Sequence, residues 1–115
     1  MNYASSDAAA IEVCNEIKEK FGEKGAIGVP MKGNIGSSQE VAEMFAKIVE
    51  TVGPVDILVN NAGITRDMLV MMMKPTDFTD VISLNLNGVF YASQAAFVRI
   101  PLSQAQDTLL SQLVS

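Results

Sequence analysis

The sequence predicts an α/β protein built on a parallel, doubly wound sheet. Short apolar segments rich in β-branched residues alternate with longer segments of helical periodicity, as is typical of parallel strands joined by crossover helices. The run from Val55 to Val59 is apolar except for one aspartate and leads directly into Asn60-Asn61-Ala62-Gly63. Ligands of open α/β sheets bind just beyond the carboxyl ends of the strands. We therefore expect a buried strand at 55–59 and a ligand-facing turn at 60–63.

Six elements are predicted in chain order. They are a strand stub at 2–4, a helix at about 7–21, a strand at 26–31, a helix at 38–52, a strand at 55–59 and a helix at 77–97. Ser5 or Ser6 can cap the first helix, and Gly22 and Gly25 end it. Pro30 restricts the second strand to an edge or terminal position because proline cannot donate to a ladder.

The later helices carry their own start and stop signals. Ser37 followed by Glu40 is a capping-box pattern, and Gly53-Pro54 ends the helix that it opens. Thr76 or Asp77 can cap the last helix, which carries a stripe of apolar residues. Each strand is thus followed by a helix that can cover the sheet.

Composition narrows the class of protein. Hydrophobic residues make up 49% of the chain and charged residues 18%, which describes a globular protein. A net charge of -5 argues against a nucleic-acid partner, and the chain has no histidine to act as general base or metal ligand. We expect no membrane partner and no targeting segment, because the longest useful apolar run is Met68 to Met73. Cys14 is the single cysteine, so no disulfide framework is expected.

The octet Asp56 to Gly63 resembles the fourth strand of the short-chain dehydrogenase/reductase family, where this turn borders the cofactor. The continuation Ile64-Thr65-Arg66-Asp67 resembles one branch of that family, the 3-oxoacyl-acyl carrier protein reductases. The resemblance implies an incomplete Rossmann-like sheet and a central fragment with both ends missing. It divides the chain into a partial dinucleotide-binding domain at 1–97 and a divergent tail at 98–115. An ordinary buried strand with an Asn-rich turn is the alternative.

The resemblance also assigns cofactor-binding residues. Asn60, Ala62 and Gly63 would line the nicotinamide side, while Asn34-Ile35 stands where the family usually has an Asp-Val pair that contacts adenine. A carboxamide both donates and accepts, so Asn60 can equally serve to stabilise the turn. The cofactor implied by the resemblance is NADP(H).

The choice of NADP(H) over NAD depends on the end of the strand stub. Dinucleotide folds place an acid there to bind the ribose 2′-hydroxyl of NAD. This chain has Ser5 and Ser6 at that point and no acid before Asp7, which favours NADP(H) weakly, since no arginine stands nearby.

Asn85 is the candidate catalytic residue. It lies on the apolar stripe of its helix, where a polar side chain must find hydrogen-bond partners or destabilise the fold. The stretch Ser83 to Phe90 resembles a family segment whose asparagine bends the helix locally and holds a water in the proton relay. A purely structural buried amide is the alternative.

The basic residues and the methionine-rich run that follow the turn indicate no single function. Arg66 and Lys74 could meet an anionic cofactor or carrier, but solvated loop charges are the favoured interpretation. The Met68–Met73 run suits core filling, a subunit contact or an acyl chain, with core or interface use favoured.

The family's catalytic pair is missing from this sequence. The family uses a tyrosine four residues before a lysine, whereas Tyr3 is followed by Asp7 and Tyr91 by Ala95. No Gly-x-Gly-x-x-Gly pattern occurs either. We expect a catalytically inactive fragment of an NADPH-dependent 3-oxoacyl-acyl carrier protein reductase, whose substrate is linked to acyl carrier protein.

The alternative is a non-catalytic subunit that docks on a full-length reductase through helix 77–97, in a homo- or hetero-oligomer. The expected location is the cytoplasm or the plastid stroma.

Overall fold

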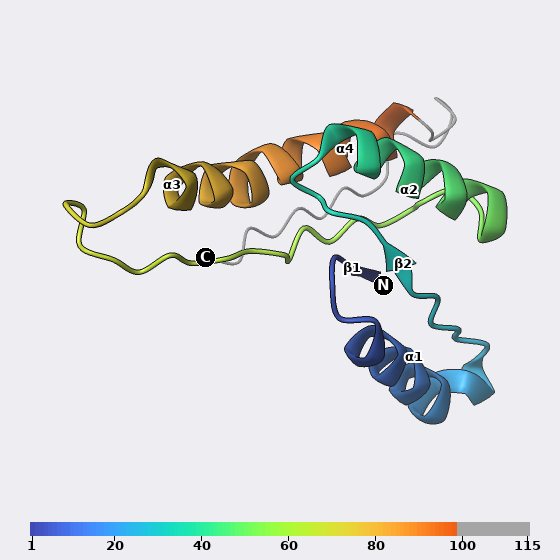
Figure 1. Cartoon of the computed structure of the whole chain (residues 1–115). Coiled ribbons are helices and arrows are strands. Elements are labelled where there is room, and N and C mark those ends of the chain that lie inside the picture. The colour runs from blue at the N-terminus through green and yellow to red at the C-terminus, as the bar shows by residue number, and fades with distance from the viewer. Residues whose placement is uncertain (99–115) are drawn as a thin grey trace. The chain divides into compact units, whose positions relative to one another are not determined.

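The computed structural model describes residues 1–98, which form two compact units that divide between Asn34 and Ile35 (Figure 1). The expected tail at 98–115 lies almost wholly outside the described residues. Each unit is built from its own helices, and the first also contains a small sheet.

The first unit is a parallel β-α-β arrangement. It contains β1 (Asn2–Tyr3), α1 (Asp7–Phe21), a 3₁₀ turn (Gly22–Lys24) and β2 (Met31–Lys32). The strands are parallel, with Asn2 opposite Met31 and Tyr3 opposite Lys32. The Asn2 side-chain amide also donates to the carbonyls of Met31 at 3.2 Å and Gly33 at 2.9 Å. The α/β class and the parallel pairing are therefore as predicted.

The predicted strand at 26–31 is wrong in its bounds, because only Met31 and Lys32 are in a strand. In the observed parallel register Asn2 faces Met31, so residues 26–29 have no β1 residue opposite them. The predicted end of the first helix is confirmed. Gly22 follows α1 directly, and Gly25 has a φ of 82°, which a side chain would disfavour.

Helix α1 and the segment before β2 approach each other at Gly28. A Cβ atom added at Gly28 would lie 2.7 Å from the Cα of Cys14, which is buried in α1. Only glycine fits at this distance, so the glycine itself permits the close packing.

The second unit packs α2 (Ser38–Thr51) against a long helical run. That run comprises α3 (Pro75–Ile82), a π-helical turn (Ser83–Asn87) and α4 (Gly88–Val98). The predicted helix at 38–52 is confirmed, and the Ser37 hydroxyl caps it by accepting from the Glu40 amide at 3.4 Å. The core between α2 and α4 consists of large side chains on α2 and small residues on α4: Val41, Met44, Phe45, Gly88, Ala92 and Ala96.

The long helix begins slightly earlier than predicted. Lys74 precedes the first residue, Pro75, and the Lys74 amide donates to the Asp77 carboxylate at 3.0 Å. Asp77 therefore acts from the first turn and not as the N-cap. The run Pro75–Val98 spans 24 residues and is, by length and composition, apolar enough to cross a membrane, which the short uninterrupted apolar runs of the sequence did not suggest. That is weak evidence for a membrane, because the core helix of a soluble protein passes the same test.

The predicted strand at 55–59 is wrong, because these residues have no regular secondary structure. Ile57 and Val59 are each 59% exposed, so the expected burial on both faces is also wrong. A strand exists only where a neighbour supplies the hydrogen-bond ladder, and apolar composition cannot replace that neighbour. Gly53, with a φ of 121°, does mark the break after α2 as expected.

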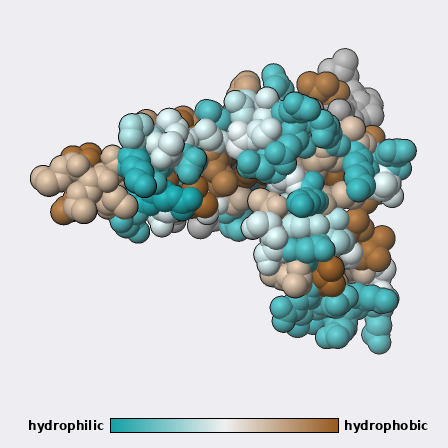
Figure 2. Space-filling model, viewed as in Figure 1, coloured by the Kyte–Doolittle hydropathy of each residue, from teal (hydrophilic) through white to brown (hydrophobic). Residues whose placement is uncertain are grey.

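The chain between α2 and α3 ends in an exposed apolar loop. Met68, Leu69, Val70, Met71 and Met72 are all exposed, and the tip in Figure 2 is correspondingly apolar. Of the two favoured uses of Met68–Met73, the core is therefore wrong for these exposed residues, while a subunit interface stays a prediction.

Candidate cofactor-facing site

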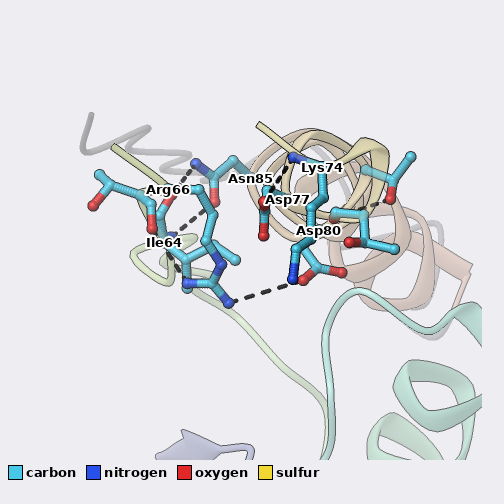
Figure 3. Close-up of polar contacts among 9 residues, drawn as sticks. Ile64, Arg66, Lys74, Asp77, Asp80 and Asn85 are labelled. Atoms are coloured by element: carbon cyan, nitrogen blue, oxygen red, sulfur yellow. Dashed lines mark hydrogen bonds and ion pairs between the residues drawn. The ribbon is translucent and has the colours of Figure 1, made fainter. Parts of the chain in front are cut away.

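Asn85 holds the backbone of Ile64 by two hydrogen bonds (Figure 3). The Ile64 amide donates to Asn85 Oδ1 at 2.9 Å, and Asn85 Nδ2 donates to the Ile64 carbonyl at 2.9 Å. The carboxamide thus pairs with a main-chain residue as a neighbouring strand would. The prediction that a polar residue on this stripe must find partners is confirmed.

The helix departs from regular α geometry at Asn85. Residues Ser83–Asn87 form a π-helical turn, and the Gly88 amide donates to the Ser83 carbonyl. Single π turns often occur at functional sites. A local irregularity at this asparagine was expected. Its role in a proton relay stays a prediction, for which the carboxamide retains one N–H and one lone pair beyond those used by Ile64.

Asn60 is the second point at which the loop is attached to the helix. Its side chain is only 8% exposed, and its Nδ2 donates to the Ser93 hydroxyl in α4 at 3.4 Å. The partner lies in a helix and not in the turn itself. Ser93 was missed by the sequence analysis, although its position eight residues after Asn85 places it on nearly the same helical face.

The residues between these two attachments face solvent. Asn61, Ala62 and Gly63 are exposed, so their backbone groups are accessible to a ligand. The structure has no hydrogen-bonded turn at 60–63, and Gly63 does not adopt a positive φ. The expected turn is therefore wrong, and the approach of a ligand to Gly63 stays a prediction.

Arg66 is paired within the second unit. Its guanidinium lies 3.9 Å from the Asp80 carboxylate and donates to the Thr65 carbonyl at 3.2 Å (Figure 3). Both side chains of the ion pair are about half exposed, so solvent screens it and its contribution to stability is small. Arg66 is thus exposed, as the interpretation of a solvated loop charge requires, and it also makes a local ion pair.

The other cofactor candidates fall in different units. Ile35 lies against Gly88 of α4, where an added Cβ would be 3.0 Å from the Ile35 carbonyl oxygen. Asn34 belongs to the first unit. Their expected contacts with adenine stay predictions.

The first unit places two ionisable groups at the end of β1. A hydrogen bond to the Asp7 carboxylate raises the pKa of the Tyr3 hydroxyl above its usual value near 10, with desolvation as the second cause. Ser6 precedes α1 without a side-chain cap bond. Among residues 1–98 no group of three or more acidic, histidine or cysteine side chains could hold a metal ion.

Comparison with known proteins identifies the family to which this chain belongs. The short chain dehydrogenase family matches residues 1–106, and the chain belongs to that family. A short chain dehydrogenase from Burkholderia cenocepacia, solved with NADP, superimposes with a TM-score of 0.79 over 96% of this chain at 24% identity. A gluconate 5-dehydrogenase from the same organism, solved with NADP and tartrate, gives 0.75 over 96% at 25% identity. The matches cover 42% and 41% of those chains.

The chain is also similar in sequence to bacterial 3-oxoacyl-[acyl-carrier-protein] reductases. The enzyme of Staphylococcus epidermidis is 47% identical over 94 residues, covering 82% of this chain and 37% of the relative. That of Staphylococcus aureus is 44% identical over 96 residues, covering 84% and 37%. The chain therefore spans little more than a third of the length of these relatives. All come from bacteria, which lends no support to a plastid location.

The described residues fit a dinucleotide only in part. The exposed backbone at 61–63, which lies between the attachments at Asn60 and Ile64, suits one wall of such a site. The sequence contains neither a Gly-x-Gly-x-x-Gly loop to hold the pyrophosphate nor a tyrosine four residues before a lysine. A complete cofactor site cannot be assembled from these residues.

Proposed function

We propose that this chain carries the nicotinamide-side wall of an NADPH-dependent 3-oxoacyl-acyl carrier protein reductase. The observation that supports this proposal most directly is the identity of 47% over 94 residues to a protein named for this activity. In the complete enzyme, hydride from the nicotinamide would reduce the 3-keto group of a carrier-linked acyl thioester. Asn60, Ala62 and Gly63 would border the cofactor, and Asn85 would position that wall.

We infer that the 115-residue chain is not catalytic in isolation. Proton donation to the carbonyl oxygen requires an acid of suitable pKa, and the two tyrosines lack the lysine that would lower theirs. Tyr3 has the opposite neighbour, because Asp7 raises its pKa.

The test is a spectrophotometric assay of the purified chain with NADPH and an acetoacetyl thioester. We expect no oxidation of NADPH above the rate without protein, while a full-length reductase serves as the positive control. A steady decrease in NADPH absorbance that depends on the concentration of this chain would refute the inference. Titration of NADPH fluorescence, run in parallel, would detect binding without turnover.

The alternative function is a non-catalytic subunit that docks on a full-length reductase. One observation favours it: the long helix exposes the aromatic residues Phe78, Phe90 and Phe97 on the side that α2 does not cover with its core residues. Phe90 and Phe97 are seven residues apart and so lie on one helical face. Exposed apolar stripes of this kind mark interaction surfaces.

Copurification with a full-length reductase tests the alternative. We expect the Phe90→Ser variant to lose the partner, while Gln39→Ser, a change at an exposed position on α2, keeps it. A chain that elutes alone in both cases would count against docking.

By relation to bacterial enzymes we infer that the protein is located in the cytoplasm.

A further inference from the structure

Three side-chain contacts connect residues 60–66 to the long helix in strict order. Asn60 contacts Ser93, Ile64 contacts Asn85, and Arg66 contacts Asp80. Residue numbers rise along the loop while they fall along the helix. The segment therefore runs antiparallel to the helix, and Figure 1 shows it extended alongside α3.

The spacing of these contacts matches the geometry of an extended chain on a helix. Four residues from Asn60 to Ile64 span about 13 Å at roughly 3.3 Å per residue, and the eight from Asn85 to Ser93 span about 12 Å at roughly 1.5 Å per residue. From Ile64 to Arg66 the extended chain covers about 7 Å, and from Asp80 to Asn85 the helix covers about 7–8 Å. The three contacts are thus in register with one another.

Within residues 1–98, no strand pairs with this segment. Residues 55–66 have no regular secondary structure, so no sheet ladder fixes their course. The contacts that do fix it come from helix side chains. Asn60 is the buried polar side chain among the described residues, and it lies at the end where the exposed 61–63 backbone begins.

We propose that Ser93 is a positioning residue, the end rung of a side-chain ladder formed with Asn85 and Asp80. This ladder holds residues 60–66 extended without a neighbouring strand and keeps the backbone of Ala62 and Gly63 facing outward. The proposal deepens the proposed function, on which it rests only for the identity of the ligand, the nicotinamide side of a pyridine dinucleotide. The ladder itself requires no ligand.

The Asn85 rung and the Ser93 rung have different strengths. Asn85 makes two bonds of 2.9 Å to the Ile64 backbone, whereas Asn60 and Ser93 share one bond of 3.4 Å. The Asn85 rung should therefore set the position of the segment, and the Ser93 rung should set the orientation of its amino-terminal end. Removing Ser93 should loosen 60–63 and leave Ile64 in place.

The experiment is amide hydrogen exchange by NMR on the full 115-residue chain without nucleotide. In Ser93→Ala we expect exchange of the Asn60 side-chain amide to accelerate about fivefold, the effect of one ordinary hydrogen bond, and the NMR order parameters of the 61–63 backbone to fall. The Ile64 amide should keep its protection. Ser93→Thr, which retains the hydroxyl, should restore the original rates, and Gln94→Ala on the same helix should change nothing.

Two results would overturn the proposal. One is unchanged exchange of the Asn60 side-chain amide together with unchanged order parameters at 61–63 in Ser93→Ala. The other is equal acceleration across α2 and α4, or a Ser93→Thr variant that behaves as Ser93→Ala, since either would make Ser93 a packing residue. Failure of the chain to bind NADPH would bear on the proposed function and would leave these exchange rates unaffected.

Discussion

The contact between Gly28 and Cys14 supports the most direct prediction about the first unit. An alanine Cβ at Gly28 would lie 2.7 Å from the Cα and 2.8 Å from the Cβ of Cys14. These are atoms of the helix main chain and its first side-chain carbon, so neither can rotate away. The segment before β2 must therefore move off α1 in Gly28→Ala.

The magnitude follows from two opposing effects. Overpacking of this kind costs typically ~1–3 kcal/mol. Replacing glycine by alanine recovers ~0.4–1 kcal/mol by restricting the unfolded chain, provided that φ is negative, as it is at Gly28. The net loss should be about 1–2 kcal/mol, which raises the population of open molecules about 5- to 30-fold.

The lone cysteine provides the assay. Cys14 is buried in α1, so a thiol reagent labels it only when this packing opens. We expect Gly28→Ala to be labelled 5- to 30-fold faster than the parent chain under conditions where labelling follows the opening equilibrium.

Gly22→Ala is the matched control. A Cβ at Gly22 would meet only the Lys18 side chain at 3.6 Å, and Gly22 has helical φ and ψ, so labelling should be unchanged or slower. Equal labelling rates for Gly28→Ala and the parent chain would refute the close-packing argument. Faster labelling in both variants would show instead that any alanine loosens this unit.

Three further predictions concern other parts of the molecule. Phe45→Ala should lower the free energy of unfolding by ~3–5 kcal/mol, because this buried ring packs in the α2–α4 core; urea denaturation followed by circular dichroism measures the loss, and a change below 1 kcal/mol would contradict the packing. In a Tyr91→Phe background, ultraviolet titration should show Tyr3 ionising above its usual pKa, and Asp7→Asn should bring the midpoint down. Because the folded-state pKa is raised, the stabilisation by this bond is present below pH about 10 and lost as the pH rises through the folded-state value; a midpoint insensitive to Asp7→Asn would exclude the bond. Because Ile57 is 59% exposed, Ile57→Ser should change the free energy of unfolding by no more than about 0.5 kcal/mol in urea denaturation, and a loss above about 1 kcal/mol would show that Ile57 is packed.

Helix positions could be predicted because their signals are local. The caps and stops at Ser37, Gly22 and Gly25 act through neighbouring backbone groups, and helices α1 and α2 begin and end within a residue of the expectation. The long helix was located for the same reason, and its irregular turn was anticipated from the resemblance around Asn85. None of these features requires a distant partner.

Strands and site contacts depended on distant groups. Residues 55–59 have the composition of a buried strand, yet they lack a ladder in the described structure and stand exposed. Ser93 carries no signal as a site residue until the fold brings it to Asn60, 33 positions earlier. Pairing of this kind depends on which backbone groups meet, and periodicity does not encode it.

The amino-acid sequence by itself determined the family of this protein and the order of its helices, and it predicted which residues would face a nicotinamide cofactor. Tertiary structure decided how those residues are held: by helix side chains at Asp80, Asn85 and Ser93, where a neighbouring strand was expected. The physical reason is that helix hydrogen bonds close within four or five residues, whereas the position of an extended segment is set by whatever partner reaches its backbone.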